Sequence, residues 1–485
     1  MCIYRYSPMP PQRPNIIIYM PDQWRGDFTG AAGHPVVRTP NYDRFAEEGL
    51  VFTNAFTTHP ICGPSRCSFC TGWYPHTRGH RSQEYLIRHD EPHLFQYLKD
   101  AGYHIAWAGK NDMLEDDLIE RTVDQRLSPE SPTTVWGDNP YEIDDPRYYS
   151  FYHGKLPGTV DDHRDGQLVR VAQRFLREDP PEPFCLFVTP GFPHPPYAAP
   201  EPYFSMYDPD EVEPPIHGEY GQMPDFMEKL SHYSGLDRVD EQHVRRIRAM
   251  YCGMITMMDD LLGDLAGTMD EEGLSGRTAF FATSDHGNYA GDYGMPTKWH
   301  TGYHDALVRI PMAVRLPDGR GRGISGAMVQ HIDVFGTILN LVDIEPEWVH
   351  FGRSMLPIMG GETEAIRDAV YAESGYNHPH EIPYSIARMG MTDMPEESGY
   401  YSFYQLFTRH PHTAARTVMI RDENWKYVWR QEDTDELYNL ESDPNETRNL
   451  VARDEPETAR KRREMRDRLW TWYAETGDIM PLPPR

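Results

Sequence analysis

The segment Cys62-Gly63-Pro64-Ser65-Arg66 places a nucleophile among groups that favour anions. Pro64 and Ser65 are typical of a helix start, with Ser65 as a cap, which would put Cys62 just before a helix N-terminus. Free backbone N–H groups and the helix dipole favour negative charge there, and Arg66 adds a forked, permanently charged donor. The segment therefore predicts nucleophilic attack on a negatively charged ester. The alternative is a small buried cysteine followed by an ordinary helix cap.

Other polar residues follow apolar runs that we predict to be buried strands. Four such runs are Ile16–Met20 before Asp22-Gln23, His104–Ala108 before Lys110, Phe184–Thr189 before His194, and Thr278–Thr283 before Asp285-His286. Open α/β sheets bind ligands beyond the carboxyl ends of their strands, so these residues should meet at one edge with Cys62 and Arg66. Taken singly, each could cap a turn or stiffen a loop. Their repeated position at strand ends favours one shared site.

Two of these pairs offer ligands for a metal ion. Asp22, Gln23 and Asp285 provide hard oxygen atoms that suit calcium, magnesium or manganese. His286 adds a nitrogen, which shifts the balance towards manganese. Such an ion would polarise a substrate oxygen and favour an ionised nucleophile.

The residues from Cys62 to Arg66, followed by Thr71-Gly72, resemble the maturation signature of the type I sulfatases, which belong to the alkaline-phosphatase-like superfamily. The resemblance covers nearly the whole chain. It implies that Cys62 is oxidised to formylglycine (3-oxoalanine), whose hydrated form is the nucleophile. It also implies a formylglycine-generating maturase as a partner.

The resemblance also implies roles for individual residues. Lys298, after Gly291-Asp292-Tyr293-Gly294-Met295, resembles the lysine that holds the sulfate and the departing group, and His194 the histidine that protonates the leaving oxygen. It therefore implies the catalytic residues Cys62, Arg66, Lys110, His194 and Lys298, and the metal ligands Asp22, Gln23, Cys62 (as formylglycine), Asp285 and His286.

Some positions depart from the sulfatase pattern. Where many sulfatases have Gly-Lys-x-His, this chain has Gly109-Lys110-Asn111-Asp112, so Asp112 replaces a histidine that usually bonds formylglycine, unless His80 or His300 takes its place. Many sulfatases also have Asp-Asp and Asp-Asn where this chain has Asp-Gln and Asp-His. These pairs resemble those of the phosphonate monoester hydrolases and phosphodiesterases of the same superfamily, whose metal is often manganese. Lys110 favours the sulfatases, because those relatives tend to lack it.

The order of apolar runs and amphipathic stretches predicts an α/β fold. We expect a large, mixed but mostly parallel sheet between layers of helices over residues 1–380, as in the alkaline-phosphatase-like fold, and a smaller α+β subdomain over residues 381–485. The first would include helices at Asn41–Glu48, Leu94–Asp100, Arg164–Arg177, Glu241–Leu265 and Asp333–Val342. The second would have short strands at Arg416–Arg421, Trp425–Trp429 and Glu436–Leu440, then a helix at Glu455–Glu475. Residues Leu127–Leu156 are expected to form a long loop.

The composition limits which binding partners and which cellular compartment we expect. A net charge of −28 over 485 residues, without a basic patch, argues against nucleic acids and anionic membranes. The first residues contain no apolar run typical of a signal peptide, which predicts a cytoplasmic location. The six cysteines form no disulfide-framework pattern. Cys67 and Cys70 form a Cys-x-x-Cys pair, but no second pair follows at zinc-finger spacing, so we expect them in a core.

These observations predict a sulfuric ester hydrolase that cleaves sulfate monoesters through formylglycine formed from Cys62. The cofactor would be one divalent metal, Ca²⁺ first and Mn²⁺ as the alternative. The substrate would be a small aryl, alkyl or carbohydrate sulfate, and a homo-oligomer is compatible with the sequence. The alternative function is hydrolysis of phosphonate monoesters or phosphodiesters with the same nucleophile and metal site.

Overall fold

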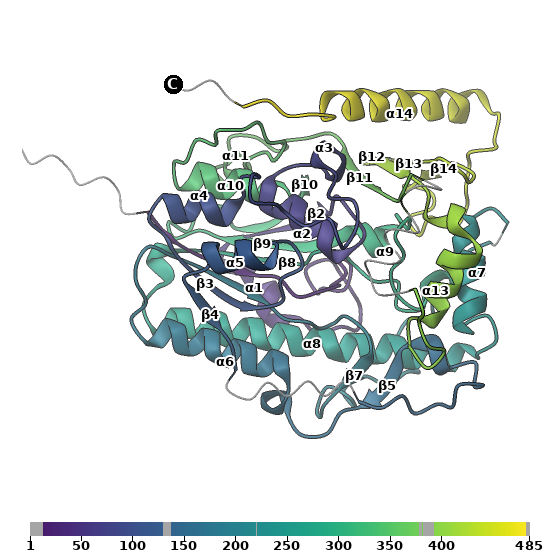
Figure 1. Cartoon of the computed structure of the whole chain (residues 1–485), viewed down its shortest axis with the longest axis horizontal. Helices are drawn as coiled ribbons and strands as arrows, with labels where there is room; N and C mark the ends of the chain where they lie inside the picture. Colours follow the sequence, from purple (N-terminus) through teal and green to yellow (C-terminus); the bar gives the residue numbers. More distant parts are fainter. Residues whose placement is uncertain (1–12, 130–136, 220, 378–380, 382–391, 482–485) are drawn as a thin grey trace, which may run out of the picture.

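A computed structural model describes residues 13–481, with the exception of 130–136, 220, 378–380 and 382–391. Its centre is an eight-stranded sheet with the strand order β10-β2-β9-β8-β1-β6-β3-β4 (Figure 1). The strands are β1 (Asn15–Tyr19), β2 (Leu50–Phe56), β3 (His104–Gly109), β4 (Gln125–Leu127), β6 (Phe184–Thr189), β8 (Thr278–Thr283), β9 (Arg309–Arg315) and β10 (Gly323–Gln330). Within this sheet β9 runs antiparallel to both of its neighbours, and the other pairs are parallel. The expected mixed, mostly parallel sheet is confirmed.

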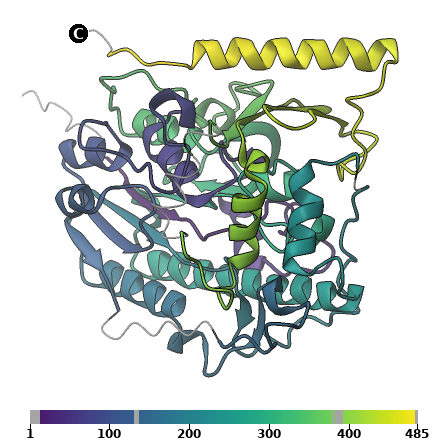
Figure 2. The ribbon, with the colours of Figure 1, turned by 45° about the vertical axis from the view of Figure 1, so that its right-hand side comes forward.

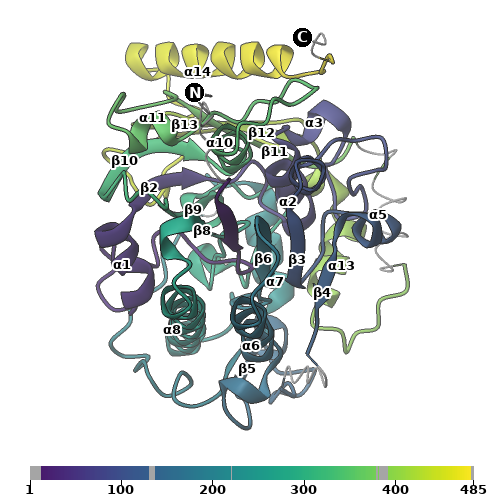
Figure 3. The same cartoon turned by 90° about the vertical axis from the view of Figure 1, so that its left-hand side faces the viewer.

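The central strands are apolar along their whole length because helices cover both faces of the sheet. Ile17 and Tyr19 of β1 belong to one core, whereas Ile16 and Ile18 belong to the other. Figure 3 shows the two helical layers. The first contains α1 (Pro40–Glu48), α6 (Arg164–Arg177) and α8 (Glu241–Glu271), and the second α2 (Cys62–Thr71), α4 (Leu94–Asp100), α5 (Asp116–Thr122), α10 (Asp333–Leu341) and α11 (Leu356–Met359).

The C-terminal part forms a separate antiparallel sheet with the order β11-β12-β13-β14. Its strands are β11 (Val370–Ser374), β12 (Thr417–Arg421), β13 (Trp425–Arg430) and β14 (Glu436–Asn439), and α14 (Pro456–Glu475) lies over it (Figure 1). Met465, Leu469 and Trp472 of this helix share a core with Val418 and Tyr427 of the sheet. The expected small sheet with one helix is confirmed. The division at residue 380 stays a prediction, and β11 lies before it.

Several elements differ from the sequence prediction. Helix α8 continues to Glu271, six residues beyond the expected end, and the predicted loop at 127–156 contains the strand β5 (Tyr152–Lys155) and a 3₁₀ turn at Tyr148–Ser150. Strand β5 pairs with β7 (Tyr197–Ala199). Among the described residues, the other α-helices are α3 (Pro75–Arg78), α7 (Asp225–Ser234), α9 (Asp305–Val308) and α13 (Tyr401–Arg409). Helices α7 and α13 lie side by side (Figures 1 and 2). In the described part of the chain, no helix has the length and apolarity needed to span a bilayer.

Candidate active site

Helix α2 begins earlier in the chain than the predicted cap at Ser65 would place it. Cys62 is its first residue, and the preceding Ile61 makes no side-chain cap. Ser65 does not cap the helix. Its hydroxyl donates to the carbonyl of Asp285 at 2.7 Å and lies 2.8 Å from the Thr57 hydroxyl. The prediction of a Ser65 cap was therefore wrong, because this buried hydroxyl instead joins the helix to the segment after β8. The expectation that Cys62 lies at a helix N-terminus holds within one residue.

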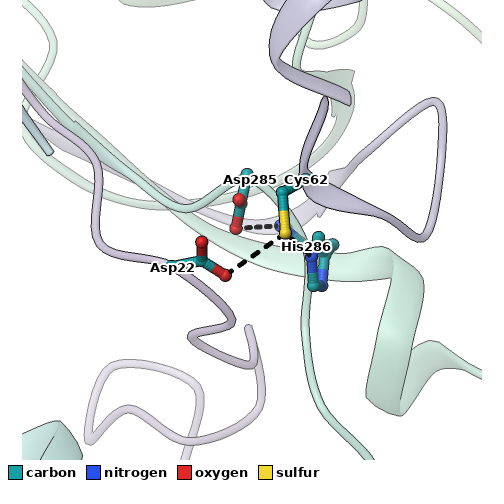
Figure 4. A group of neighbouring side chains, drawn as sticks. All are labelled: Asp22, Cys62, Asp285 and His286. Atoms are coloured by element: carbon teal, nitrogen blue, oxygen red, sulfur yellow. Dashed lines mark hydrogen bonds between the residues drawn. The ribbon is translucent and has the colours of Figure 1, made fainter. Parts of the chain in front are cut away.

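The ends of three elements bring four buried side chains together. Asp22 follows β1, Asp285 and His286 follow β8, and Cys62 opens α2. One ligand-type atom from each lies within 4.8 Å of the others, and Figure 4 shows the side chains pointing toward one another. The shared edge arises because β1 and β8 are parallel neighbours in register, with Tyr19 opposite Ala282. The expected convergence at the strand ends is therefore present for these residues.

Cations neutralise the two buried carboxylates. Nε of Arg66 donates to Oδ2 of Asp285 at 2.9 Å, and its Nη2 lies 3.5 Å from Oδ2 of Asp22. Lys110 Nζ lies 2.6 Å from the same Asp22 oxygen. Burial alone would raise the pKa of Asp22, but Lys110, Lys298 and other nearby charges hold it well below its usual range. Both carboxylates are therefore ionised.

One nitrogen of the Arg66 guanidinium is not used in these ion pairs. Its Nη1 is buried and has no hydrogen-bond partner among the residues that the structure describes. An unpaired buried donor costs about 1–3 kcal/mol, so the position favours an anionic oxygen supplied by a ligand.

The donor set fits a divalent cation at Asp22, Asp285 and His286. The Nδ1–H of His286 donates to the carbonyl of Gly287 at 2.8 Å, because a carbonyl can only accept. The free lone pair is therefore on Nε2, which lies 3.4 Å from Cys62 Sγ. Fixing the imidazole through its second nitrogen is how proteins orient a metal-binding histidine.

Gln23 is held tightly but faces other partners. Its backbone φ is +72°, in the left-handed region. Asp285 accepts its N–H at 3.0 Å, and its carbonyl accepts from the Tyr251 hydroxyl at 2.5 Å. Its Oε1 accepts from Asn288 Nδ2 at 2.9 Å and Thr297 Oγ1 at 3.0 Å, while its Nε2 is buried without a partner in the described chain. Both donors to Gln23 Oε1 come from side chains outside the Asp22, Cys62, Asp285 and His286 cluster.

Two lysines flank Cys62. Lys298 Nζ lies 2.8 Å from Cys62 Sγ. Lys110 Nζ lies between Asp22 and Asp112, at 2.7 Å from the latter. Lys110 follows Gly109, whose φ of +110° and tight approach to the Thr189 carbonyl leave no room for a side chain. Asp112, which replaces the usual histidine, thus pairs with Lys110.

His80 and His300 were the two histidines that could take the place of the one missing at Asp112. In the described structure, neither forms a hydrogen bond with Cys62. His80 Nδ1 bonds the Tyr85 carbonyl at 2.8 Å, and its Nε2 lies 3.3 Å from Glu91. His300 lies 5.0 Å from the Phe407 ring, and burial and Lys298 lower its pKa to about 3. The histidine beside Cys62 Sγ is His286.

His194 borders the cluster. Its Nδ1–H donates to the Pro195 carbonyl at 2.6 Å, which leaves Nε2 as the acceptor. Burial and the nearby Lys298 lower its pKa to about 3. The imidazole is therefore neutral near pH 7, and a substrate anion would have to raise its pKa before it could act as an acid. Burial and Asp22 raise the pKa of the Cys62 thiol to about 11, so the unmodified thiol is protonated as well.

The residues that hold the site in place were not predicted from the sequence. Asn288, Thr297 and Tyr251 fix Gln23, and Asp165 of α6 accepts the N–H groups of Gly191 at 2.9 Å and Phe192 at 2.7 Å. Asn288, three residues after Asp285, and Thr297, directly before Lys298, lie near predicted site residues in the sequence. Cys67 and Cys70 are free, buried cysteines in the core beside α4, as expected.

Comparison with known proteins identifies the family. The model of the family described as Sulfatase matches residues 14–344. The chain therefore belongs to the sulfatase family and is a sulfuric ester hydrolase.

Individual relatives extend over most of the chain. The multifunctional alkaline phosphatase superfamily protein PehA of Trinickia caryophylli is 28% identical to this chain. The match spans 96% of this chain and 96% of PehA. The choline-sulfatase of Rhizobium meliloti (strain 1021) is 27% identical, over 90% of this chain and 82% of the relative. The arylsulfatase of Clostridium perfringens is 26% identical, over 91% of each.

Solved structures share the fold. The phosphonate monoester hydrolase of Agrobacterium radiobacter superposes with a TM-score of 0.77 and 22% identity, over 97% of this chain and all of that one. A putative sulfatase of Bacteroides thetaiotaomicron gives a TM-score of 0.72 and 18% identity, over 97% and 96%. The expected alkaline-phosphatase-like architecture is confirmed.

Proposed function

We propose that this chain hydrolyses sulfate monoesters with formylglycine formed from Cys62 as its nucleophile. The supporting observation is the set of cationic donors that the site offers to an anion. Lys298 lies 2.8 Å away, and Arg66 keeps one buried N–H group without a partner in the described chain. Such donors stabilise charge that develops on the oxygens of a transferring group. When formed, formylglycine supplies a hydrated aldehyde oxygen as the nucleophile.

The other site residues bind the sulfate, transfer a proton and bind the metal ion. Arg66, Lys110 and Lys298 bind and orient the sulfate oxygens. Once the bound anion has raised the pKa of His194, its Nε2 transfers a proton to the oxygen of the leaving alcohol. Asp22, Asp285 and His286 would hold a divalent cation, which would polarise one sulfate oxygen. Ca²⁺ suits the two carboxylates, and Mn²⁺ is the alternative that the imidazole favours.

The maturase would have to reach Cys62 before the chain folds. The cysteine is 1% exposed and lies in a fully buried helix. We therefore propose that a formylglycine-generating enzyme acts on the unfolded segment. The relatives that act on small sulfates, by their names a choline-sulfatase and an arylsulfatase, support a small sulfated substrate.

A comparison of two substrates tests the function. The chain would be produced with a formylglycine-generating enzyme, and kcat/KM measured for an aryl sulfate and an aryl phosphodiester with the same alcohol, each with Ca²⁺ and with Mn²⁺. We expect the sulfate to be the better substrate. A preference for the phosphodiester would contradict the proposal.

Hydrolysis of phosphonate monoesters or phosphodiesters is the second candidate. The Asp22-Gln23 and Asp285-His286 pairs favour it, and a multifunctional protein is among the relatives. Lys110, which lies beside Asp22, favours the sulfate, because the phosphonate monoester hydrolases and phosphodiesterases tend to lack a lysine at this position.

The variant Lys110→Gln should therefore lower kcat/KM for the aryl sulfate by about 100-fold, the usual cost of one stabilising donor. Lys99→Gln, at a surface pair with Asp124, is the matched control and should leave the rate unchanged. Equal rates for wild type and Lys110→Gln on the sulfate would favour the second candidate.

A further inference from the structure

Asp112 borders the reactive centre from the loop after β3. A Cβ atom added at Gly63, the residue after Cys62, would lie 3.2 Å from the Asp112 carbonyl oxygen, so this loop packs on the first turn of α2. The Asp112 carboxylate pairs with Lys110 Nζ at 2.7 Å, and the same nitrogen lies 2.6 Å from Asp22 Oδ2. One ammonium group thus joins Asp112 to a proposed metal ligand.

The loop is shaped by Asn111 rather than by the Asp112 carboxylate. Asn111 Oδ1 accepts the N–H of Leu114 at 3.0 Å, and its Nδ2 donates to the Leu114 carbonyl at 2.8 Å. Within the described part of the chain, the ion-pair partner of Asp112 is Lys110. The side chains of Asp112 and Lys110 are 22% and 28% exposed, whereas that of Asp22 is fully buried. The pair therefore lies on the open side of the charged cluster.

The charges of the site balance only when Asp112 is counted. The three cations are Arg66, Lys110 and Lys298, and the two other carboxylates are Asp22 and Asp285. The two imidazoles are neutral, because burial lowers the pKa to about 3 in His194 and to about 4 in His286. Without Asp112 the chain would offer an anion one surplus positive charge, and with Asp112 it offers none. A bound divalent cation would add the same charge in both cases.

We infer that Asp112 is a specificity-determining residue, which favours esters with one negative charge over phosphate monoesters, which carry two above pH 6. The inference rests on the proposed function, because it takes this cluster to be the anion site. A carboxylate at the open side of the site repels the second charge of such a ligand, and the low dielectric of a partly buried site strengthens this repulsion. Sulfate monoesters and phosphodiesters each carry one charge, so Asp112 does not distinguish between them.

Two ligands that differ by one charge test the inference without turnover. Phenyl sulfate and phenyl phosphate share the ring and a tetrahedral anionic group, and at pH 8 phenyl phosphate carries the extra charge. Calorimetry would give both dissociation constants in the Cys62→Ala background with the divalent metal present. Asp112→Asn keeps an oxygen that can accept from Lys110 and removes the charge. We expect it to shift the ratio of the two constants about tenfold toward phenyl phosphate, chiefly because phenyl phosphate binds more tightly.

Asp116→Asn is the matched control. Asp116 is exposed in the first turn of α5, and the substitution changes the net charge of the chain by the same amount. It should leave the ratio unchanged. The inference fails if Asp112→Asn shifts the ratio toward phenyl sulfate or shifts it no more than Asp116→Asn does. Equal weakening of both ligands would likewise contradict it, because that result would show only a displaced Lys110.

The same titrations at pH 5.5 separate charge from shape. Phenyl phosphate gains a proton as the pH falls through about 6, whereas phenyl sulfate stays singly charged. The effect of Asp112→Asn on the ratio should therefore be smaller at pH 5.5 than at pH 8, and an effect of equal size would contradict the inference. If the parent bound neither ligand, the proposed anion site would fail as well. Failure of the ratio tests alone would leave the proposed function standing, since turnover of a sulfate against a phosphodiester tests that function at equal charge.

Discussion

At the scale of single residues, the site depends on charges that balance one another around Cys62. Arg66 contacts both Asp22 and Asp285, so removing the guanidinium would leave Asp285 without its ion pair, whereas Asp22 would keep Lys110. Removing one partner of such a buried set costs several kcal/mol, on the order of 3–5. Burial, with the nearby Asp22, raises the pKa of the Cys62 thiol, so the residue is a poor nucleophile until it is modified.

The nucleophile is the first residue to test. Cys62→Ala and Cys62→Ser should each reduce kcat on an aryl sulfate by at least about 10³-fold, because alanine has no nucleophilic group and a sulfate ester on serine has no second hydroxyl from which sulfate could be expelled. Cys70→Ala provides the control, since Cys70 lies on the same helix but packs in the core beside α4. Steady-state turnover near the wild-type rate in Cys62→Ala would contradict the mechanism.

At the scale of elements, parallel neighbouring strands carry the chemistry to one edge. Asp22, Lys110 and Asp285 each follow a strand of the same parallel set, β1, β3 and β8. Helix α6, in the first helical layer, positions the loop after β6. Asp165 of α6 holds its backbone, and the carbonyl of Phe192 in turn accepts the N–H of Asp22 at 3.3 Å. One buried carboxylate thus places both the His194 loop and a metal ligand.

Asp165→Asn should therefore lower kcat on an aryl sulfate by about tenfold. An amide has one acceptor oxygen and one donor group, so it cannot accept both N–H groups with the carboxylate's geometry, and a small displacement of a catalytic group is costly. Asp161→Asn, at an exposed ion pair with Arg170, is the control. A fall in the formylglycine content by mass spectrometry, with an unchanged rate per modified chain, would instead assign Asp165 to folding.

Helices and strands whose ends depend on the local pattern of apolar residues were predicted correctly from the sequence. The ends of α4, α6, β6 and β8 agree with their apolar runs and bounding residues. Contacts between distant segments were not predictable in this way. The left-handed backbone of Gln23 depends on Tyr251 and Asp285, each more than 200 residues away, and the start of α2 depends on where Ser65 finds its partner. The role of Asp112 became clear only when its distance to Lys110 was known.

At the scale of the whole molecule, the C-terminal sheet supports the segment that carries Lys298. Lys426 of β13 donates to the carbonyl of Tyr303 at 2.7 Å, and Arg430 donates to that of Thr301 at 2.8 Å. Both side chains are buried. The small sheet is thus part of the active-site framework, although it supplies none of the proposed metal ligands.

Buried histidines should make the whole molecule sensitive to acid. Burial lowers the pKa of His93 to about 4, so this side chain binds a proton more readily when the chain unfolds. Its contribution to stability is present above pH 6.5 and is lost as the pH falls toward 4, by about 2 kcal/mol between pH 7 and pH 5. Other histidines, among them His243 with a pKa of about 4, act in the same direction.

His93→Asn isolates one of these contributions. His93 caps α4 by accepting the N–H of Gln96, and asparagine is a good cap that does not titrate. Thermal unfolding at pH 7 and pH 5 should show a smaller loss of Tm for the variant than for wild type. An equal or larger loss would contradict the assignment.

The dependence of turnover on formylglycine content tests the central claim most directly. Preparations with different fractions of modified Cys62 would be made by varying the level of the maturase, and the fraction measured by mass spectrometry of the peptide that contains residue 62. We predict that kcat per chain on an aryl sulfate rises in proportion to this fraction, along a line through the origin. Turnover that stays constant while the fraction changes would contradict the account.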